Sequence, residues 1–141
     1  MLKEILKDKI QTIKNVKDWR EAIKISANPL LKSQSITENY IDSMIKNVEQ
    51  FGEYILVADN VALPHSRPEN GVNENCLSLL KIDEGVAFDN GEKAYLFFTL
   101  GAKDSDQHIN TLKELMEIID DEDKVQSIID AKSIEEIYSL I

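Results

Sequence analysis

The sequence has a single cysteine, a shortage of basic residues and no long apolar run. Because Cys76 has no partner in the chain, an internal disulfide is excluded, and a reducing compartment is expected. There are 16 Lys and Arg against 26 Asp and Glu, and the net charge of −10 argues against nucleic acid and anionic membrane as partners. Lysines interrupt the stretch from Leu2 to Val16 every few residues, so it predicts neither a membrane span nor a signal peptide. We therefore expect a cytoplasmic protein without direct membrane insertion.

The 141 residues, 43% of them apolar, suffice for one domain with a real core, and we expect a single domain over residues 1–141. Capping patterns predict one helix after Asp18, interrupted at Asn28-Pro29, and another from Ser35 and Glu38 to Gly52. Helical spacing also predicts helices over residues 106–119, 123–131 and 134–140. Short apolar runs predict strands over 54–58, 61–63, 76–82, 85–88 and 94–100, and residues 9–16 fit a strand or a short helix. Helices at both ends with strands between them predict an α/β fold, a three-layer sandwich with a central mixed sheet flanked by helices.

The most informative segment surrounds His65. The chain has only two histidines and two arginines, and His65 and Arg67 stand two positions apart between Pro64 and Pro68. The prolines restrict their own backbone and that of the preceding residues, so the loop can hold an imidazole in one orientation. A neutral imidazole is a nucleophile near pH 7 and a guanidinium binds oxyanions, so the pair suits the handling of phosphate.

The second histidine, His108, shares a helical face with Leu112, Leu115 and Ile119, and it follows the strongest predicted strand. It is therefore expected in the first turn of a helix, where the helix dipole lowers the basicity of an imidazole and attracts anions. His65 also follows a predicted strand. The two histidines could therefore meet at one edge of the sheet.

Other roles for these residues remain open. His65 could be an exposed loop residue, His108 a structural first-turn residue, and Arg67 a partner of Glu69. Cys76 is expected to be a small core residue on a strand. A metal-dependent hydrolase is the weaker interpretation, because the sequence has no His-x-x-x-His pair and no cysteine pair, and we expect no metal.

The block from Gly52 to Val72 resembles the active-site region of enzyme IIA proteins of the phosphoenolpyruvate-dependent sugar phosphotransferase system. The resemblance is to the mannitol/fructose superfamily (the type-2 domain) and most of all to its ascorbate-type branch, where Ala-Leu-Pro-His-Ala-Arg-Pro-Glu-x-Gly-Val is typical. Here the run reads Ala-Leu-Pro-His-Ser-Arg-Pro-Glu-Asn-Gly-Val. The later His108-Ile109-x-x-Leu112-x-x-Leu115 is similar to the second histidine motif of that family, and the resemblance covers nearly the whole chain.

The resemblance implies a phosphotransferase function and a role for each matching residue. His65 would accept a phosphoryl group from the phosphocarrier protein HPr at Nε2 and pass it to a cysteine of enzyme IIB, which serves the membrane enzyme IIC. His108 would position or stabilise that group, and no cofactor is implied. Mannitol-type members have an arginine in the preceding helix where Asn47 or a neighbour stands here, and Arg67 is a candidate replacement. Ser66 replaces the usual Ala or Gly, and its hydroxyl could bind phosphate.

Both partner proteins must reach the phosphoryl group, so we expect a shallow apolar depression around His65 with acidic residues at its rim. The transported compound is expected to be ascorbate-like or a polyol. An alternative from another class is a regulatory enzyme IIA-like module, which would report its phosphorylation state to a regulator and would not serve transport.

Overall fold

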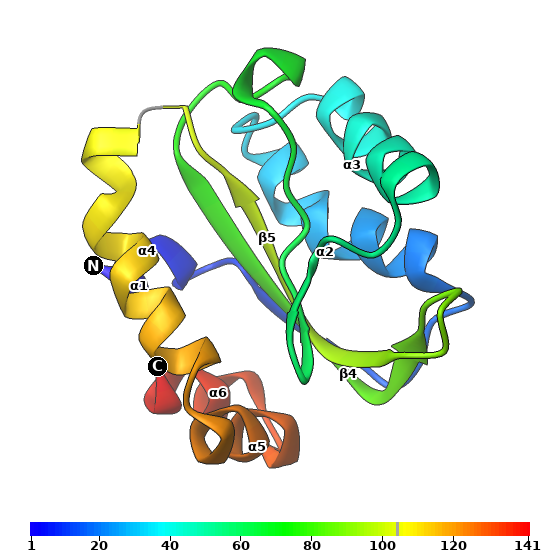
Figure 1. The fold of residues 1–141 in the computed structure, drawn as a ribbon. Coiled ribbons are helices and arrows are strands. Elements are labelled where there is room, and N and C mark those ends of the chain that lie inside the picture. Colours follow the sequence, from blue (N-terminus) through cyan, green and yellow to red (C-terminus); the bar gives the residue numbers. More distant parts are fainter. Residues whose placement is uncertain (104) are drawn as a thin grey trace.

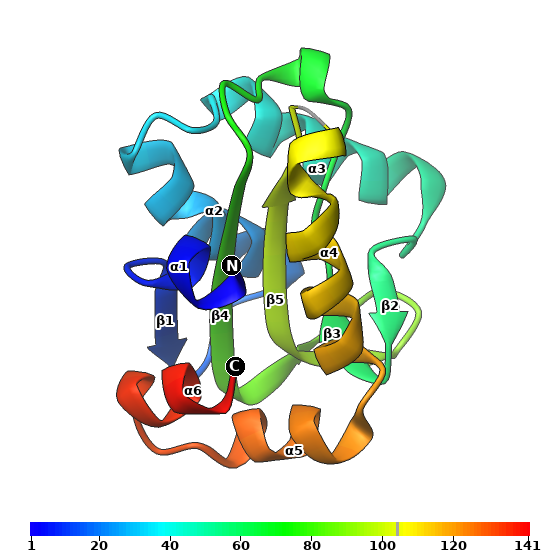
Figure 2. The same cartoon turned by 90° about the vertical axis from the view of Figure 1, so that its left-hand side faces the viewer.

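A five-stranded mixed sheet lies between two layers of helices in the computed structural model, which describes residues 1–103 and 105–141 (Figures 1 and 2). The strands are β1 (Ile10–Ile13), β2 (Leu56–Ala58), β3 (Asn60–Ala62), β4 (Cys76–Ala87) and β5 (Lys93–Gly101). The helices are α1 (Leu2–Leu6), α2 (Trp19–Lys32), α3 (Glu38–Phe51), the 3-10 turn η1 (Pro68–Asn70), α4 (Ser105–Ile119), α5 (Glu122–Asp130) and α6 (Ile134–Leu140). This confirms the predicted α/β three-layer sandwich.

The strands lie in the order β1-β4-β5-β3-β2. β1 runs parallel to β4 and β3 parallel to β5, whereas β4–β5 and β2–β3 are antiparallel pairs. Because β3 and β5 are parallel neighbours, the segments that follow them leave from the same end of the sheet, where α4 also begins (Figure 2). These are the segments that carry His65 and His108.

Each face of the sheet has its own core. Helices α2 and α3 cover one face, and α1, α4, α5 and α6 cover the other (Figure 1). The consecutive residues Phe97 and Phe98 are both fully buried, one in each core, as the alternation of side chains along a strand requires. Both helical layers therefore pack against β5, the strand that ends beside the His65 loop.

Two of the predicted helix boundaries are wrong. Helix α2 continues through Asn28-Pro29 to Lys32, because the side-chain amide of Gln11 donates to the carbonyl of Ile25 (2.8 Å), the group that a proline at position 29 leaves without its helical partner. Helix α3 is capped by Thr37, whose side chain accepts from the N–H of Tyr40. The predicted cap, Ser35, is buried and donates to Glu74 (2.8 Å) instead.

The remaining differences concern strands and the N-terminus. The two strands predicted over 76–82 and 85–88 form one long strand, β4. The polar residues between them lie at a bulge between Lys81 and Val86, where the pairing with β5 shifts register without ending. Residues 9–16 contain strand β1, and the short helix α1 was not predicted. Asn60 makes the β2–β3 turn with a φ of 70°, a conformation that asparagine tolerates. Within the described ranges no helix has the length and apolar character needed to cross a lipid bilayer.

Candidate functional site

The loop that carries His65 is fastened to the sheet on both sides. The N–H of Leu63 donates to the carbonyl of Ile55 (2.7 Å), and the N–H of Leu100 donates to the carbonyl of Pro64 (2.9 Å). Pro64 is buried, whereas His65 is half-buried. The backbone that leads into His65 therefore has a fixed course, as the proline at position 64 predicts.

A main-chain contact selects the tautomer of His65. Its Nδ1 lies 2.6 Å from the carbonyl oxygen of Leu63. A carbonyl can only accept a hydrogen bond, so Nδ1 carries the proton in the neutral ring. Nε2 then holds the free lone pair and is the nucleophilic nitrogen of this imidazole.

Two tyrosines hydrogen-bond to the segments around His65. The hydroxyl of Tyr54 donates to the carbonyl of His65 (2.8 Å). The hydroxyl of the fully buried Tyr40 donates to the carbonyl of Leu100 (2.6 Å) and accepts from the N–H of Ser66 (3.0 Å). Burial raises the pKa of Tyr40 to about 12, so the phenol stays neutral and keeps its proton for Leu100.

Ser66 joins the loop to two further elements through its side chain. Its Oγ accepts from the amide Nδ2 of Asn47 on α3 (3.1 Å) and from Nδ2 of Asn70 in η1 (2.9 Å). Asn47, one of the residues considered for the position of the mannitol-type arginine, therefore lies at the site and contacts the loop directly.

An open depression surrounds the imidazole of His65. It has a volume of about 490 Å³ and is lined by Asn47, Phe51, Tyr54, His65, Ser66, Arg67 and Pro68. Phe51 is 68% exposed at this surface, which agrees with the expected apolar depression. The side chain of Arg67 is 84% exposed, and its guanidinium lies 4.0 Å from the carboxylate of Glu69. Arg67 is thus held only weakly by Glu69 and is free to turn toward an anion.

His108 lies in the first turn of α4, as predicted, but it does not line this depression. It is buried, with 2% of its surface exposed, and its Nε2 has no hydrogen-bond partner in the described part of the chain. Burial lowers the pKa of His108, in the predicted direction. The structure thus places both histidines beyond the ends of parallel neighbouring strands, one half-buried in the loop and the other beneath the surface.

Cys76 takes no part in the depression. It is buried at the start of β4, as expected of a core cysteine, and burial raises the pKa of its thiol to about 12, which leaves it protonated and unreactive. Within residues 1–103 and 105–141, no group of three or more His, Cys, Asp and Glu side chains is arranged to hold a metal ion.

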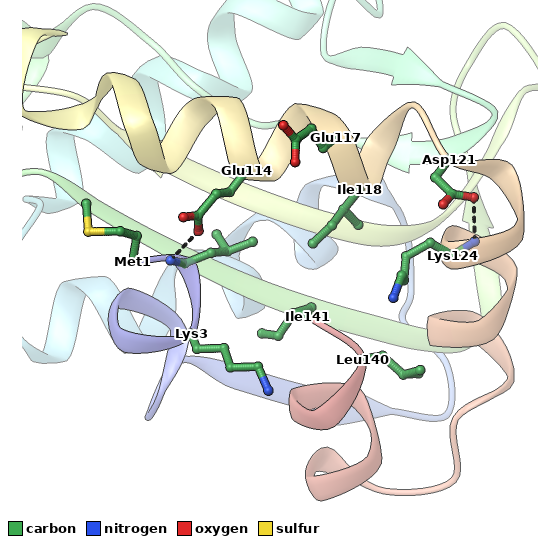
Figure 3. Close-up of a pocket in the computed structure, with 10 residues that line it drawn as sticks. Met1, Lys3, Glu114, Glu117, Ile118, Asp121, Lys124, Leu140 and Ile141 are labelled. Atoms are coloured by element: carbon green, nitrogen blue, oxygen red, sulfur yellow. Dashed lines mark hydrogen bonds between the residues drawn. The ribbon is translucent and has the colours of Figure 1, made fainter.

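A second depression of about 460 Å³ lies where α1, α4 and the C-terminus meet (Figure 3). Two of its carboxylates serve the fold: Glu114 accepts from the N–H of Leu2 (2.7 Å), and Asp121 caps α5 by accepting from the N–H of Lys124 (3.1 Å). Its described lining includes no histidine or cysteine. Among the described residues, an imidazole is therefore found in the depression around His65 and not in this one.

Three residues of the site, Tyr40, Tyr54 and Asn70, were not predicted from the sequence. Tyr40 belongs to the apolar stripe of α3, and only the packing of that helix against β5 shows that its hydroxyl reaches the His65 loop. Asn70 follows His65 closely in the sequence, but its contact with Ser66 depends on the turn η1. Asn47 was considered only as one of the residues that could stand in place of an arginine, and its contact with Ser66 was not predicted.

The relatives of this chain share its fold and its length. It is 35% identical over 133 residues to the mannitol-specific cryptic phosphotransferase enzyme IIA component of Escherichia coli K12 (94% of this chain, 90% of the relative). It is 30% identical over 126 residues to the ascorbate-specific enzyme IIA component of Mycoplasma pneumoniae (88% and 79%). The solution structure of the cryptic mannitol enzyme IIA CmtB of E. coli superposes with a TM-score of 0.91 at 33% identity (99% and 96%).

A complex of the mannitol enzyme IIA with phosphorylated enzyme IIB from E. coli has the same fold, with a TM-score of 0.79 at 20% identity (94% and 93%). The family model described as "Phosphoenolpyruvate-dependent sugar phosphotransferase system, EIIA 2" matches residues 4–141. These matches confirm the resemblance of the chain to enzyme IIA proteins, with both mannitol-type and ascorbate-type relatives. The chain therefore belongs to the EIIA type-2 family of the phosphoenolpyruvate-dependent sugar phosphotransferase system, whose members are phosphoryl-transfer components.

Proposed function

We propose that this protein is a cytoplasmic phosphoryl carrier that accepts a phosphoryl group from phospho-HPr on His65 and passes it to a cysteine of enzyme IIB. The observation that carries the proposal is the Nδ1–H···O=C contact of His65 with Leu63 (2.6 Å), which leaves Nε2 as the nucleophile in an open depression. The complex of the mannitol enzyme IIA with phosphorylated enzyme IIB supports the choice of acceptor protein. The mannitol-type and ascorbate-type relatives support a polyol or an ascorbate-like compound as the final recipient.

In the first transfer, the lone pair of His65 Nε2 attacks phosphorus, and the P–N bond to the histidine of HPr breaks. The electron pair of that bond returns to HPr. The proton stays on Nδ1 and remains hydrogen-bonded to the Leu63 carbonyl, which stabilises the positive charge on the phosphorylated ring. In the second transfer, a cysteine thiolate of enzyme IIB attacks phosphorus and the electron pair of the new P–N bond returns to Nε2.

Phosphoryl transfer requires in-line positioning and stabilisation of anionic oxygens rather than extensive covalent chemistry. Arg67 supplies a mobile positive charge beside His65, and Ser66 supplies a hydroxyl. His108 has a buried nitrogen without a partner near the same end of the sheet, and in this proposal it stabilises the phosphorylated state. Phe51, Tyr54 and Pro68 provide the apolar surface on which the partner proteins alternate.

The test is phosphorylation by phosphoenolpyruvate with enzyme I and HPr, followed by mass mapping. We expect one phosphate per chain on His65, labile in acid and stable in base, and none on a folded His65→Ala variant. Equal labelling of that variant would contradict the site. Labelling of His65 without onward transfer to the cysteine of enzyme IIB would favour the regulatory alternative over a role in transport.

A further inference from the structure

The hydroxyl of Ser66 is in an unusual hydrogen-bonding position. A serine hydroxyl has one proton to donate and two lone pairs with which to accept. In the described part of the chain both hydrogen bonds of Ser66 Oγ are received, from Asn47 Nδ2 at 3.1 Å and from Asn70 Nδ2 at 2.9 Å. Because amide donors occupy both lone pairs, the hydroxyl can form a further hydrogen bond only by donating its proton.

The two amides reach Ser66 from two neighbouring elements, α3 and η1. Asn47 projects from helix α3. Asn70 is fixed in η1, where its N–H donates to the carbonyl of Arg67 (3.0 Å) and its carbonyl accepts from the side chain of Asn39 (2.8 Å). The backbone N–H of Ser66 is already used by Tyr40 (3.0 Å), so the side chain is the part of Ser66 that can serve a ligand.

Ser66 and His65 are adjacent residues that line the same depression. A group that can only donate requires a partner that accepts, and the oxygens of a phosphoryl dianion are strong acceptors. We propose that Asn47 and Asn70 are positioning residues that commit the Ser66 hydroxyl to donate to the phosphoryl group on His65. This inference rests on the proposed function and adds to it a neutral donor, distinct from the charge of Arg67.

The inference can be tested without partner proteins by phosphorylating His65 with phosphoramidate. In that reaction Nε2 attacks phosphorus, the P–N bond of the reagent breaks and ammonia leaves. The ³¹P resonance of the phosphohistidine is then followed against pH. A hydrogen bond from Ser66 favours the dianion, so in Ser66→Ala we expect the midpoint of the titration to rise by about one pH unit, a tenfold change in proton affinity.

The variants are chosen to separate donation from packing. Ser66→Thr keeps the hydroxyl and should retain the wild-type midpoint. Asn70→Asp offers a carboxylate that captures the Ser66 proton, so its midpoint should rise at least as far as that of Ser66→Ala. Asn73→Ala is the matched control, because it removes an amide that donates to Gln34 (2.8 Å) on the surface. Arg67, Glu69 and Tyr54, the charged and titratable groups around the site, are retained in all these variants, and only Asn70→Asp adds a charge, which acts on the midpoint in the same direction as the loss of the Ser66 donor.

A double-mutant cycle tests whether Asn70 acts through Ser66. Asn70→Ala should raise the midpoint in the wild type and have no further effect in Ser66→Ala, whereas additive effects would overturn the positioning role. An unchanged midpoint in Ser66→Ala, with His65 labelled, would overturn the inference and leave the proposed function intact. Labelling by phosphoramidate but not by phospho-HPr would instead overturn the proposed function.

Discussion

Tyr54 holds His65 through two different contacts. Its hydroxyl donates to the His65 carbonyl at 2.8 Å, and its ring stands edge-on to the imidazole at an interplanar angle of 84°, with the ring centroids 5.2 Å apart. One contact fixes the backbone of the nucleophile and the other fixes the plane of its ring. The two contacts can be removed separately, because phenylalanine retains the ring and loses only the hydroxyl.

Tyr54→Phe should slow phosphorylation by phospho-HPr about threefold, and Tyr54→Ala by about tenfold or more, because only the second variant frees the imidazole plane. Rapid-quench measurement of the labelled protein gives both rates. Tyr138→Phe, a change at a distant aromatic ring that packs beside Lys3, is the control. Equal rates for the two Tyr54 variants would assign no role to the ring contact.

Arg67→Ala should lower the rate of phosphorylation by about tenfold, because it removes the mobile charge that meets the anionic transition state. Arg67→Lys should recover part of the loss, since lysine keeps the charge but not the planar fork. The chain offers a matched control in its other arginine, Arg20, which is paired with Glu49 (2.9 Å) on the surface. If Arg67→Ala and Arg20→Ala are phosphorylated at the same rate, Arg67 has no role in phosphoryl transfer beyond its exposed ion pair with Glu69.

His108→Ala should give a folded protein that is still phosphorylated on His65 but transfers the group to enzyme IIB several-fold more slowly. The reason is the loss of a donor to the phosphorylated state. Single-turnover transfer from the isolated phosphoprotein measures this step. Transfer at the wild-type rate would remove His108 from the mechanism.

Acid should destabilise the protein partly through His108. Burial lowers its pKa in the folded state below the ordinary 6.5, so the unfolded chain binds the proton first as the pH falls. The stability due to neutral His108 is complete above pH 6.5 and is lost as the pH falls through the folded-state pKa. In urea titrations between pH 7.5 and 5, His108→Gln should show a shallower fall in the free energy of unfolding than the wild type. Parallel curves would contradict this assignment.

Tyr40→Phe should lower the free energy of unfolding by about 1–3 kcal/mol, because it leaves the N–H of Ser66 and the carbonyl of Leu100 without their shared partner. Urea denaturation at pH 7.5 measures the change. Tyr138→Phe again serves as the control, since its ring packing with Lys3 is retained. A change smaller than about 0.5 kcal/mol would show that the loop is held without the phenol.

The elements that could be predicted from the sequence are those whose signals are local. The strand in β5, the cap at Asp18 and the stop at Gly52 follow from neighbouring residues, and so does the stiff loop around His65. The course of α2 past Pro29 could not be predicted, because the donor that satisfies Ile25 is Gln11, from a different element.

The residues of the candidate site also divide into those that the local sequence predicts and those that it does not. The proline-flanked histidine and its arginine are visible in one short segment of sequence. The residues that hydrogen-bond to that segment lie on α3, on η1 and at the end of β5. The apolar stripe of α3 predicts that Tyr40 is buried, but it does not predict the hydrogen-bond partners of the Tyr40 hydroxyl. Packing between distant elements therefore decides which polar groups of the site are donors and which are acceptors.

The acceptor that holds the Nδ1 proton of His65 is the main-chain oxygen of Leu63, an atom that every amino acid possesses. No point substitution at position 63 can delete it, unlike a carboxylate in the same role. Substitutions around the loop can alter the docking of partner proteins and the rate of phosphoryl transfer. The choice between the two ring nitrogens depends only on the path of the backbone at Leu63.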